Sequence, residues 1–336
     1  MNSSLDDFEL IKIASDLTGE SIKSIRPING GGNNRIYKAE SNNGAFALKY
    51  YLQQKNDDRD RIGQEYIALS ILSANGIEQV PKVIGVNYNK NCAVYEWIEG
   101  VPTADFTASD VDEMAEFLLL IQELRNLDCV KDIKHASASC ISIADAVNQL
   151  TYRIKRLCEV SHSSFELKRY LDEDLVPAAE TAINDVKNEI YSIGYSIDDR
   201  LTISRQALSP SDFGFHNSIR RKGGEITFID FEYFGWDDPV KMICDIMWHP
   251  GMNLSSSMAN RFFEKIAPFF VQNDKFFLFR FNLLKPIYKF IWCTIILNEF
   301  LPDKWDRRQA AGHLDVEKSK KTQLKKSIEL FQSAKS

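Results

Sequence analysis

Cysteine is scarce in this sequence, and the few cysteines stand far apart. The six are Cys92, Cys129, Cys140, Cys158, Cys244 and Cys293. None of them forms the Cys-x-x-Cys pair that is typical of zinc sites and redox-active dithiols. Disulfide frameworks belong mainly to short secreted chains, whereas this chain has 336 residues. We therefore expect reduced thiols in the core of a cytoplasmic protein.

Long hydrophobic runs are also missing. The longest, Phe290 to Leu297, lies between Lys289 and Glu299. It is far shorter than the roughly 20 residues that a helix needs to span a bilayer. The first ten residues include three acidic ones and no basic-then-apolar pattern, so they do not resemble a secretory signal. We expect a buried helix at 290–297 and no insertion into a membrane.

Positive charge is not in excess. The chain contains 41 basic and 47 acidic residues, for a formal net charge of −6. This balance argues against a nucleic-acid partner, because nucleic-acid-binding domains normally present a basic face. The hydrophobic share of 44% and the charged share of 26% are typical of soluble globular proteins. This length suits one large domain or two lobes that share a cleft, and nothing in the sequence indicates an oligomeric state.

The first hundred residues carry mainly strand signals. Residues 24–51 alternate in strand fashion, and turn clusters at 29–34 and 41–44 divide them into three strands. A helical pattern follows and ends at Asn75-Gly76. Two short strands are then expected, at about 82–88 and 91–96.

Beyond Gly100 the pattern is mainly helical. Ser109 and Asp112 have the spacing of a capping box, which predicts a helix start there. Further helices are expected at 143–158, at 165–191 and up to about Phe300, with an amphipathic helix at the end of the chain. Three strands are expected within this helical part: 201–208, 217–221 and 226–231.

This order predicts an α+β fold with two lobes. Residues 1–98 form a small antiparallel-sheet lobe, and residues 99–336 form a larger, mainly helical lobe. A hinge near residues 96–100 joins them. This is the layout of a protein-kinase-like fold.

Polar residues that suit a magnesium site surround two of the predicted strands. Asn217 follows Asp212 by five residues, and Asp230 follows Asp212 by eighteen. Mg²⁺ prefers hard oxygen ligands, which the amide of Asn217 and the carboxylate of Asp230 supply. Asp212 is then left to accept the proton of a hydroxyl group. The alternative is that these residues lie in ordinary turns, since the Asp-x-x-x-x-Asn pattern alone is common by chance.

The residues after the second strand carry a family resemblance. Ile229-Asp230-Phe231-Glu232-Tyr233 precedes Gly235-Trp236-Asp237-Asp238-Pro239 and then Asp245-Ile246. This series resembles the aminoglycoside phosphotransferase and choline kinase superfamily, which has a protein-kinase-like fold. The resemblance implies that Asp212 is the catalytic base and that Asn217 and Asp230 bind Mg²⁺. In one departure, Pro210-Ser211 stands where the family has His-Gly, a His that braces the catalytic loop.

A glycine-rich segment precedes the second predicted strand. Gly30-Gly31-Gly32-Asn33-Asn34-Arg35 has the glycines that let backbone N–H groups approach phosphate oxygens, although a plain hairpin turn has the same pattern. The segment lacks the Gly-Lys-Ser/Thr ending of a P-loop. The resemblance implies that Gly31, Gly32, Asn34 and Arg35 cover the nucleotide.

Lys49 lies in an otherwise apolar strand, Phe46 to Tyr50, and Glu65 follows it by sixteen residues on the predicted helix. An ion pair between them would hold the ammonium group beside the nucleotide phosphates; an exposed lysine and a solvated glutamate are the alternative. By position and analogy, the backbone of Glu96 and Ile98 in the hinge would contact adenine.

These residues together predict a small-molecule kinase. It would use Mg²⁺ and ATP, with GTP as an alternative donor, to phosphorylate a hydroxyl group of a sugar, amino-sugar or amino alcohol. The second hypothesis is a nucleotide-binding pseudokinase with a regulatory or scaffolding role, motivated by the missing His before Asp212. A protein kinase is disfavoured because the chain has no His-Arg-Asp loop and no Ala-Pro-Glu segment.

Three further residues each allow two interpretations. His216 lies in the catalytic loop, either in contact with phosphate or acceptor or in a structural position. Glu232 and Asp237 either shape the acceptor site or cap the next helix.

Overall fold

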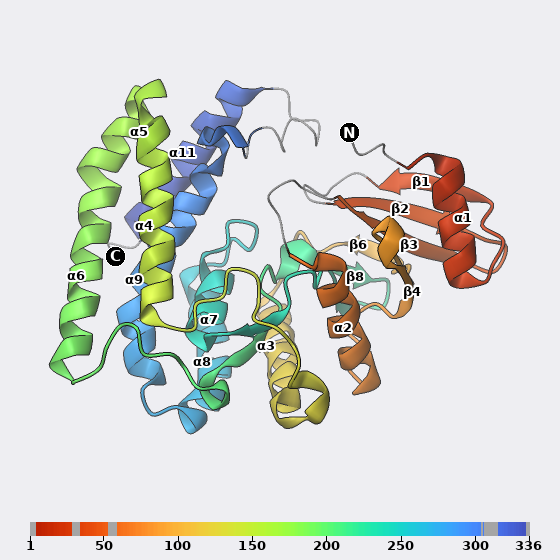
Figure 1. The fold of residues 1–336 in the computed structure, drawn as a ribbon, viewed down its shortest axis with the longest axis horizontal. Helices are drawn as coiled ribbons and strands as arrows, with labels where there is room; N and C mark the ends of the chain where they lie inside the picture. Colours follow the sequence, from red (N-terminus) through yellow and green to blue (C-terminus); the bar gives the residue numbers. More distant parts are fainter. Residues whose placement is uncertain (1–4, 29–33, 53–58, 304, 306–314, 334–336) are drawn as a thin grey trace. The chain divides into compact units, whose positions relative to one another are not determined.

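The computed structural model describes residues 5–28, 34–52, 59–303, 305 and 315–333 (Figure 1). Contacts divide the chain into two compact units. Unit 1 comprises Met1–Ser137 and Pro210–Gly235, and unit 2 comprises Ala138–Ser209 and Trp236–Ser336. These units are not the lobes predicted at 1–98 and 99–336, and that lobe boundary stays a prediction.

Unit 1 contains a five-stranded antiparallel sheet with strand order β1-β2-β3-β5-β4. Its strands are β1 (Ser24–Ile28), β2 (Asn34–Glu40), β3 (Ala45–Tyr51), β4 (Val83–Asn87) and β5 (Cys92–Glu96). The five strands predicted from the sequence are therefore confirmed. β3 occupies the centre of the sheet, which puts Lys49 between Ile36 of β2 and Ala93 of β5.

Helix α1 (Asp7–Thr18) covers one face of this sheet (Figure 1). Leu10 of α1 packs in one buried cluster with Leu48 and Tyr50 of β3. Helix α1 was not predicted from the sequence, although Asp6 and Glu9 form a capping box at its start. Helix α2 (Arg61–Ala74) was predicted, and it ends as expected at Asn75-Gly76.

The rest of unit 1 joins helix α3 to a three-stranded sheet of order β6-β8-β9. These elements are α3 (Ala108–Glu123), β6 (Gly100–Pro102), β8 (Ser218–Arg221) and β9 (Ile226–Phe228). The capping box of α3 consists of Thr107 and Asp110, so the predicted pair Ser109 and Asp112 is wrong by two residues. Thr107 has the extended backbone that a cap requires, whereas Ser109 is already helical.

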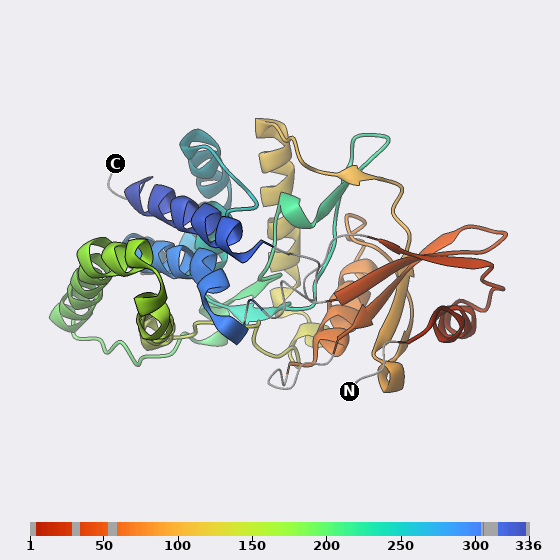
Figure 2. The same cartoon turned by 90° about the horizontal axis from the view of Figure 1, so that it is seen from above.

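Unit 2 is mainly helical. Its helices are α4 (Ile143–Val160), α5 (Phe165–Tyr170), α6 (Val176–Ser192), α7 (Pro239–Trp248), α8 (Ser256–Asn273), α9 (Phe277–Ile296) and α11 (Val316–Ser333). Helix α9 contacts α4, α6, α7, α8 and α11, and Figures 1 and 2 show α4, α9 and α11 side by side. Within the described residues, no helix combines the length and the hydrophobicity that crossing a bilayer requires.

Short segments connect these elements. Single 3₁₀ turns are Tyr88–Lys90, Leu124–Asn126, Asp128–Val130, Ser161–Ser163, Ile203–Arg205, Phe215–Asn217 and Leu297–Phe300, and Leu171–Leu175 is a π turn. The short strands β7 (Ala207–Ser209) and β10 (Gly235–Asp237) pair with each other.

Two strand predictions need correction. The strand expected at 201–208 is only β7, because Ile203–Arg205 forms a turn in which the Gln206 side chain donates to the Leu201 carbonyl oxygen at 2.8 Å. The strand expected at 226–231 ends at Phe228, since Asp230 has a left-handed φ of 70° that a strand cannot contain.

The cysteine prediction is partly confirmed. All six cysteines lie in the described part of the chain as free thiols. Cys92, Cys140, Cys244 and Cys293 are buried, but Cys129 and Cys158 are exposed, so the expectation of six core thiols is wrong for these two.

Candidate functional site

Lys49 is the centre of a buried charge cluster in unit 1. Leu48 and Tyr50 face the core beneath α1, so strand alternation turns Lys49 to the opposite face of β3. Lys49 is only 5% exposed. Its Nζ atom lies 2.6 Å from Glu65 Oε2 of α2, contacts Asp230 Oδ1, and is 3.5 Å from Glu232 Oε2. The structure thus contains the ion pair between Lys49 and Glu65 and excludes the exposed alternative.

Hydrogen bonds hold Glu65 on both carboxylate oxygens. The Tyr51 hydroxyl donates to Oε2 at 2.6 Å and is itself 2.7 Å from the Tyr95 hydroxyl. The backbone N–H of Phe231 donates to Oε1 at 3.3 Å. Because Phe231 stands between Asp230 and Glu232, this bond ties the segment that carries both acids to α2.

The cluster holds more negative than positive groups. Three carboxylates, from Glu65, Asp230 and Glu232, face two cations, Lys49 and Arg61, whose Nη1 lies 3.7 Å from Glu232 Oε1. Burial raises the pKa of Glu65 to about 7 although Lys49 lowers it, and burial likewise raises the pKa of Asp230. A further cation next to these carboxylates would therefore be stabilised.

Lys49 and Glu232 keep their charges despite burial. Burial alone would lower the pKa of Lys49, but Asp230, Glu65 and Glu232 together raise it well above its ordinary value. Burial would raise the pKa of Glu232, but Lys49 and the hydrogen bond from Asn34 hold it below its ordinary value. The surrounding carboxylates therefore favour the charged form of the ammonium group.

Asp230 and Asn217 are brought together by the backbone. The N–H of Ile229, one residue before Asp230, donates to the carbonyl oxygen of Asn217 at 2.9 Å. The side-chain Nδ2 of Asn217 donates to the carbonyl oxygen of Asp212 at 2.9 Å. This bond uses the nitrogen of the amide and not its oxygen. Amide and carboxylate oxygens are the donor set that Mg²⁺ prefers, so these residues fit that ion.

The loop that carries Asp212 is anchored by two phenylalanines. Phe213 stacks on Phe117 of α3 with ring centroids 5.5 Å apart, and Phe215 stacks on Phe106 at 4.4 Å. Ser211 has a left-handed φ of 70°, which places the sharp bend directly before Asp212. The Asp212 side chain is 43% exposed. The loop thus presents a carboxylate on a rigid base.

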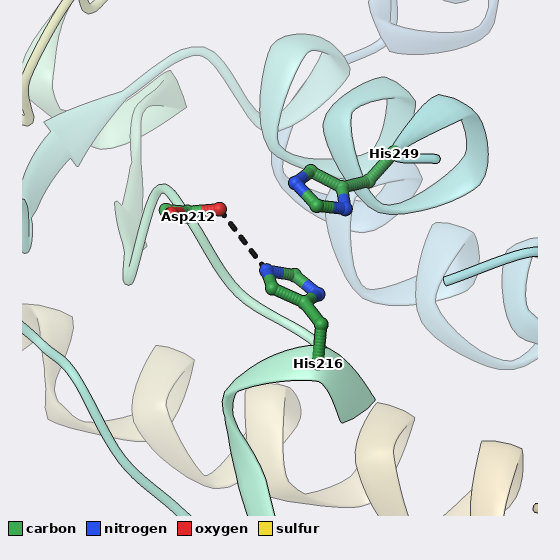
Figure 3. A group of neighbouring side chains, drawn as sticks. All are labelled: Asp212, His216 and His249. Carbon is green, nitrogen blue, oxygen red and sulfur yellow. Dashed lines mark hydrogen bonds and ion pairs between the residues drawn. The ribbon is translucent and has the colours of Figure 1, made fainter. Parts of the chain in front are cut away.

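His216 lies next to Asp212. Its Nε2 atom is 3.1 Å from Asp212 Oδ1, and Figure 3 shows the imidazole ring directed at that carboxylate. A hydrogen bond of this kind restricts the orientation of the carboxylate. Pro210-Ser211 stand where the resembled family has His-Gly, and in this chain His216 contacts the Asp212 carboxylate.

The remaining predicted residues lie around this cluster or outside the described part. Gly31 and Gly32 lie outside the described residues, and Arg35 is exposed on β2. The buried Asn34 donates to Glu232 Oε2 at 2.5 Å and accepts from Arg61 Nη1 at 3.0 Å. Their roles toward a nucleotide stay predictions.

The hinge segment leaves β5 at Glu96. The Glu96 N–H donates to the carbonyl oxygen of Lys82 at 2.9 Å, and Ile98 is buried. The Glu96 N–H is thus occupied, so a contact from Glu96 to adenine would use its carbonyl oxygen.

Comparison with known proteins supports the family resemblance. The model of a family described as the phosphotransferase enzyme family matches residues 24–264. The chain belongs to this family. The predictions of a phosphotransferase and of an aminoglycoside phosphotransferase-like chain are thereby confirmed. No curated protein matches the sequence of this phosphotransferase.

Solved structures share the fold of this phosphotransferase at low sequence identity. A spectinomycin phosphotransferase, solved with ADP and spectinomycin, is 14% identical, with 98% of this chain and 100% of that chain covered and a TM-score of 0.63. A choline kinase from Streptococcus pneumoniae is 16% identical, with 97% and 99% covered and a TM-score of 0.58. These structures confirm the predicted α+β, protein-kinase-like fold.

Neither Glu232 nor Asp237 of this phosphotransferase caps the next helix. Glu232 does not cap the next helix: it is 1% exposed and belongs to the Lys49 cluster. Asp237 is not a cap either, because Asp238 caps α7 by accepting from the Val240 N–H. Asp237 is buried in unit 2 and accepts from the Cys140 N–H at 2.8 Å.

Arg61 and Tyr51 were not predicted as members of the site, and Glu232 was left open between the acceptor site and a helix cap. Glu232 and Asn34 are 198 residues apart in the sequence, so no local sequence pattern predicts their contact. Tyr51 is different, since strand alternation places it on the same face of β3 as Lys49. That signal was present in the sequence.

We predict that Glu65→Gln changes how stability depends on pH. The pKa of Glu65 is raised from its ordinary value of 4.5 to about 7. A carboxyl group with a raised pKa in the folded state stabilises the fold below pH 4.5, and this contribution is lost as the pH rises through about 7. The variant should lack this loss, which is on the order of 1–3 kcal/mol.

The measurement is the free energy of unfolding from urea titrations across this pH window. The matched control is Glu78→Gln, at an exposed glutamate of the same unit, which should follow the wild-type profile. A Glu65→Gln profile that runs parallel to wild type would contradict the assignment.

Proposed function

We propose that this phosphotransferase transfers the γ-phosphate of ATP to a hydroxyl group of a small molecule, with Mg²⁺ as its metal ion. The observation that carries the proposal is the buried Lys49 ammonium group, held by Glu65 at 2.6 Å and in contact with Asp230. A buried ion cluster is costly to desolvate, so it is weak support for stability and stronger support for a charged ligand. The proposal puts the reaction in the cytoplasm, where ATP is supplied.

The chain contains the groups that phosphoryl transfer requires. Lys49 donates to oxygens of the nucleotide phosphates, and Glu65 fixes its position. Asp230 and Asn217 hold Mg²⁺ through carboxylate and amide oxygens. When bound, the ion supplies positive charge that neutralises the phosphates. Gly31, Gly32, Asn34 and Arg35 cover the nucleotide, and the backbone of Glu96 and Ile98 contacts its base; GTP is the alternative donor.

Asp212 acts on the acceptor. The acceptor oxygen forms a bond to the γ-phosphorus while the bond from that phosphorus to the β,γ-bridging oxygen breaks, and ADP leaves. Asp212 accepts the proton that the hydroxyl group loses. An exposed carboxylate on an anchored loop suits this role, because it is accessible and fixed in position.

The acceptor is proposed as a sugar, an amino-sugar or an amino alcohol. The solved relatives include a spectinomycin phosphotransferase, a choline kinase and a gentamicin complex of an aminoglycoside phosphotransferase, whose TM-score is 0.55 at 14% identity. The pseudokinase alternative rests on Pro210-Ser211 in place of His-Gly. The hydrogen bond between His216 and Asp212 favours the active enzyme.

We predict that Asp212→Asn abolishes phosphoryl transfer and leaves nucleotide binding intact. An amide cannot accept the proton, and loss of a general base lowers turnover by about 10²–10⁴-fold. The measurement is acceptor-dependent release of ADP from ATP and Mg²⁺, over a panel of sugars, amino-sugars and amino alcohols.

The control for this variant is Asp185→Asn, at an exposed aspartate of α6. It should keep the wild-type rate. Turnover by Asp212→Asn at the wild-type rate would contradict the role of Asp212. Nucleotide binding by the wild type without turnover on any acceptor would favour the pseudokinase.

We predict that His216→Ala lowers kcat by roughly tenfold to a hundredfold, because Asp212 loses its hydrogen-bonding partner and its fixed orientation. KM should stay near the wild-type value, since His216 positions the base without binding the nucleotide. His216→Gln retains a donor and should recover part of the rate. Steady-state kinetics of both variants checks this, and wild-type kcat in both would disprove the positioning role.

A further inference from the structure

A polar pocket lies within unit 2. It is formed by the end of α7, the loop that follows it, and helices α8, α9 and α11. Its volume is about 900 Å³. Pockets of this size hold small organic molecules. The reaction proposed above uses none of the residues that line it.

Three lysines line this pocket: Lys285 and Lys289 from α9 and Lys326 from α11. Lys285 and Lys289 are four residues apart, so they lie on one face of their helix. Among the described residues that line the pocket, Glu329 is the one with a carboxylate. Its Oε1 atom lies 3.8 Å from the Nζ atom of Lys325, a residue that does not line the pocket. The pocket is therefore positively charged.

Lys289 is the most unusual of the three. It is only 4% exposed, and among the described residues no carboxylate forms an ion pair with it. Its Nζ atom lies 4.2 Å from the centroid of the Trp248 ring, and that of Lys285 lies 5.6 Å from the same centroid. Burial lowers the pKa of Lys289 to about 8. Cys293 acts to raise this pKa, and the charge of Lys285 lowers it further. Buried lysines are rare unless an anion accompanies them.

Trp248 adds a hydrogen-bond donor without an acceptor. Its indole Nε1 is buried, and no described residue accepts from it. Buried indole N–H groups normally have a partner. The pocket wall thus combines an unpaired buried ammonium group, a second ammonium group beside it and an unpaired N–H donor.

We propose that this pocket binds the phosphate group of a phosphorylated small molecule. Lysine ammonium groups are point charges that suit phosphate, and a phosphate offers several oxygens to several donors at once. A pocket with three lysines disfavours a cationic ligand, and its volume exceeds what inorganic phosphate alone would fill. The groups that carry this proposal are the lysines and Trp248 of unit 2, and none of them is assigned a role in the reaction proposed above.

The test is calorimetric titration of the full chain with glucose 6-phosphate, inorganic phosphate and glucose. We expect glucose 6-phosphate and phosphate to bind and neutral glucose not to bind. Lys289→Met, which keeps the side-chain length, should weaken binding of glucose 6-phosphate about tenfold or more.

A matched pair of variants on α11 controls for total charge. Lys326→Met removes a lysine of the pocket and should weaken binding, whereas Lys321→Met removes an exposed lysine outside it and should not. Thermal unfolding shows whether each variant folds, and Lys285→Met replaces Lys289→Met if the latter does not. Failure of the wild type to bind glucose 6-phosphate overturns the proposal. So does equal affinity in wild type and in every folded variant of the pocket.

Incubation with ATP and Mg²⁺ then distinguishes two sources of the ligand. A phosphorylated acceptor would be consumed as ADP forms. A regulator would change ADP release with another acceptor and remain unchanged itself. Either result supports the site, and binding without any turnover would leave the site standing while the proposed reaction fails.

Discussion

The contact between the Lys49 ammonium group and its surrounding carboxylates is the interaction on which the candidate site depends. One cation on the central strand of the sheet holds Glu65 of α2 and Asp230 of the segment after β9. Glu65 in turn binds the backbone of Phe231, so strand, helix and acidic segment fix one another. If the ammonium group is removed, the buried carboxylates of Glu65 and Glu232 and the partly exposed carboxylate of Asp230 lose their main counter-charge, which costs several kcal/mol. Desolvation of these charges makes the cluster a weak source of stability by itself, but the cluster suits a site that binds phosphates.

The catalytic loop positions one exposed carboxylate, that of Asp212. Phe213 and Phe215 anchor the loop in the core, Asn217 closes it by donating to the Asp212 carbonyl oxygen, and His216 contacts the Asp212 side chain. A family position that normally braces this loop is changed to Pro210-Ser211. Four residues after the aspartate, His216 contacts its carboxylate, and this contact restricts the orientation of that side chain.

Much of this site was predictable because its signals are local. The strand that carries Lys49, the helix that carries Glu65 and the spacing of Asp212, Asn217 and Asp230 all follow from short patterns. What escaped prediction depends on distant contacts: Glu232 meets Asn34 across 198 residues. Local competition explains other errors, since the left-handed backbone of Asp230 ends a strand that hydrophobicity alone would continue. Helix α1 was not predicted, although Asp6 and Glu9 have the spacing of a capping box, which indicates a helix start. The pocket of unit 2 could not be predicted, because its lysines come from helices that only the tertiary fold brings together.

The most direct test of the central claim is to compare the binding of ATP with Mg²⁺ and the binding of adenosine in wild type and Lys49→Met. If Lys49 holds the phosphates, the variant should lose about tenfold or more in affinity for ATP. It should bind adenosine, which has no phosphate, as well as wild type does, and this shows that the fold is intact. Equal affinity of both proteins for ATP would contradict the account.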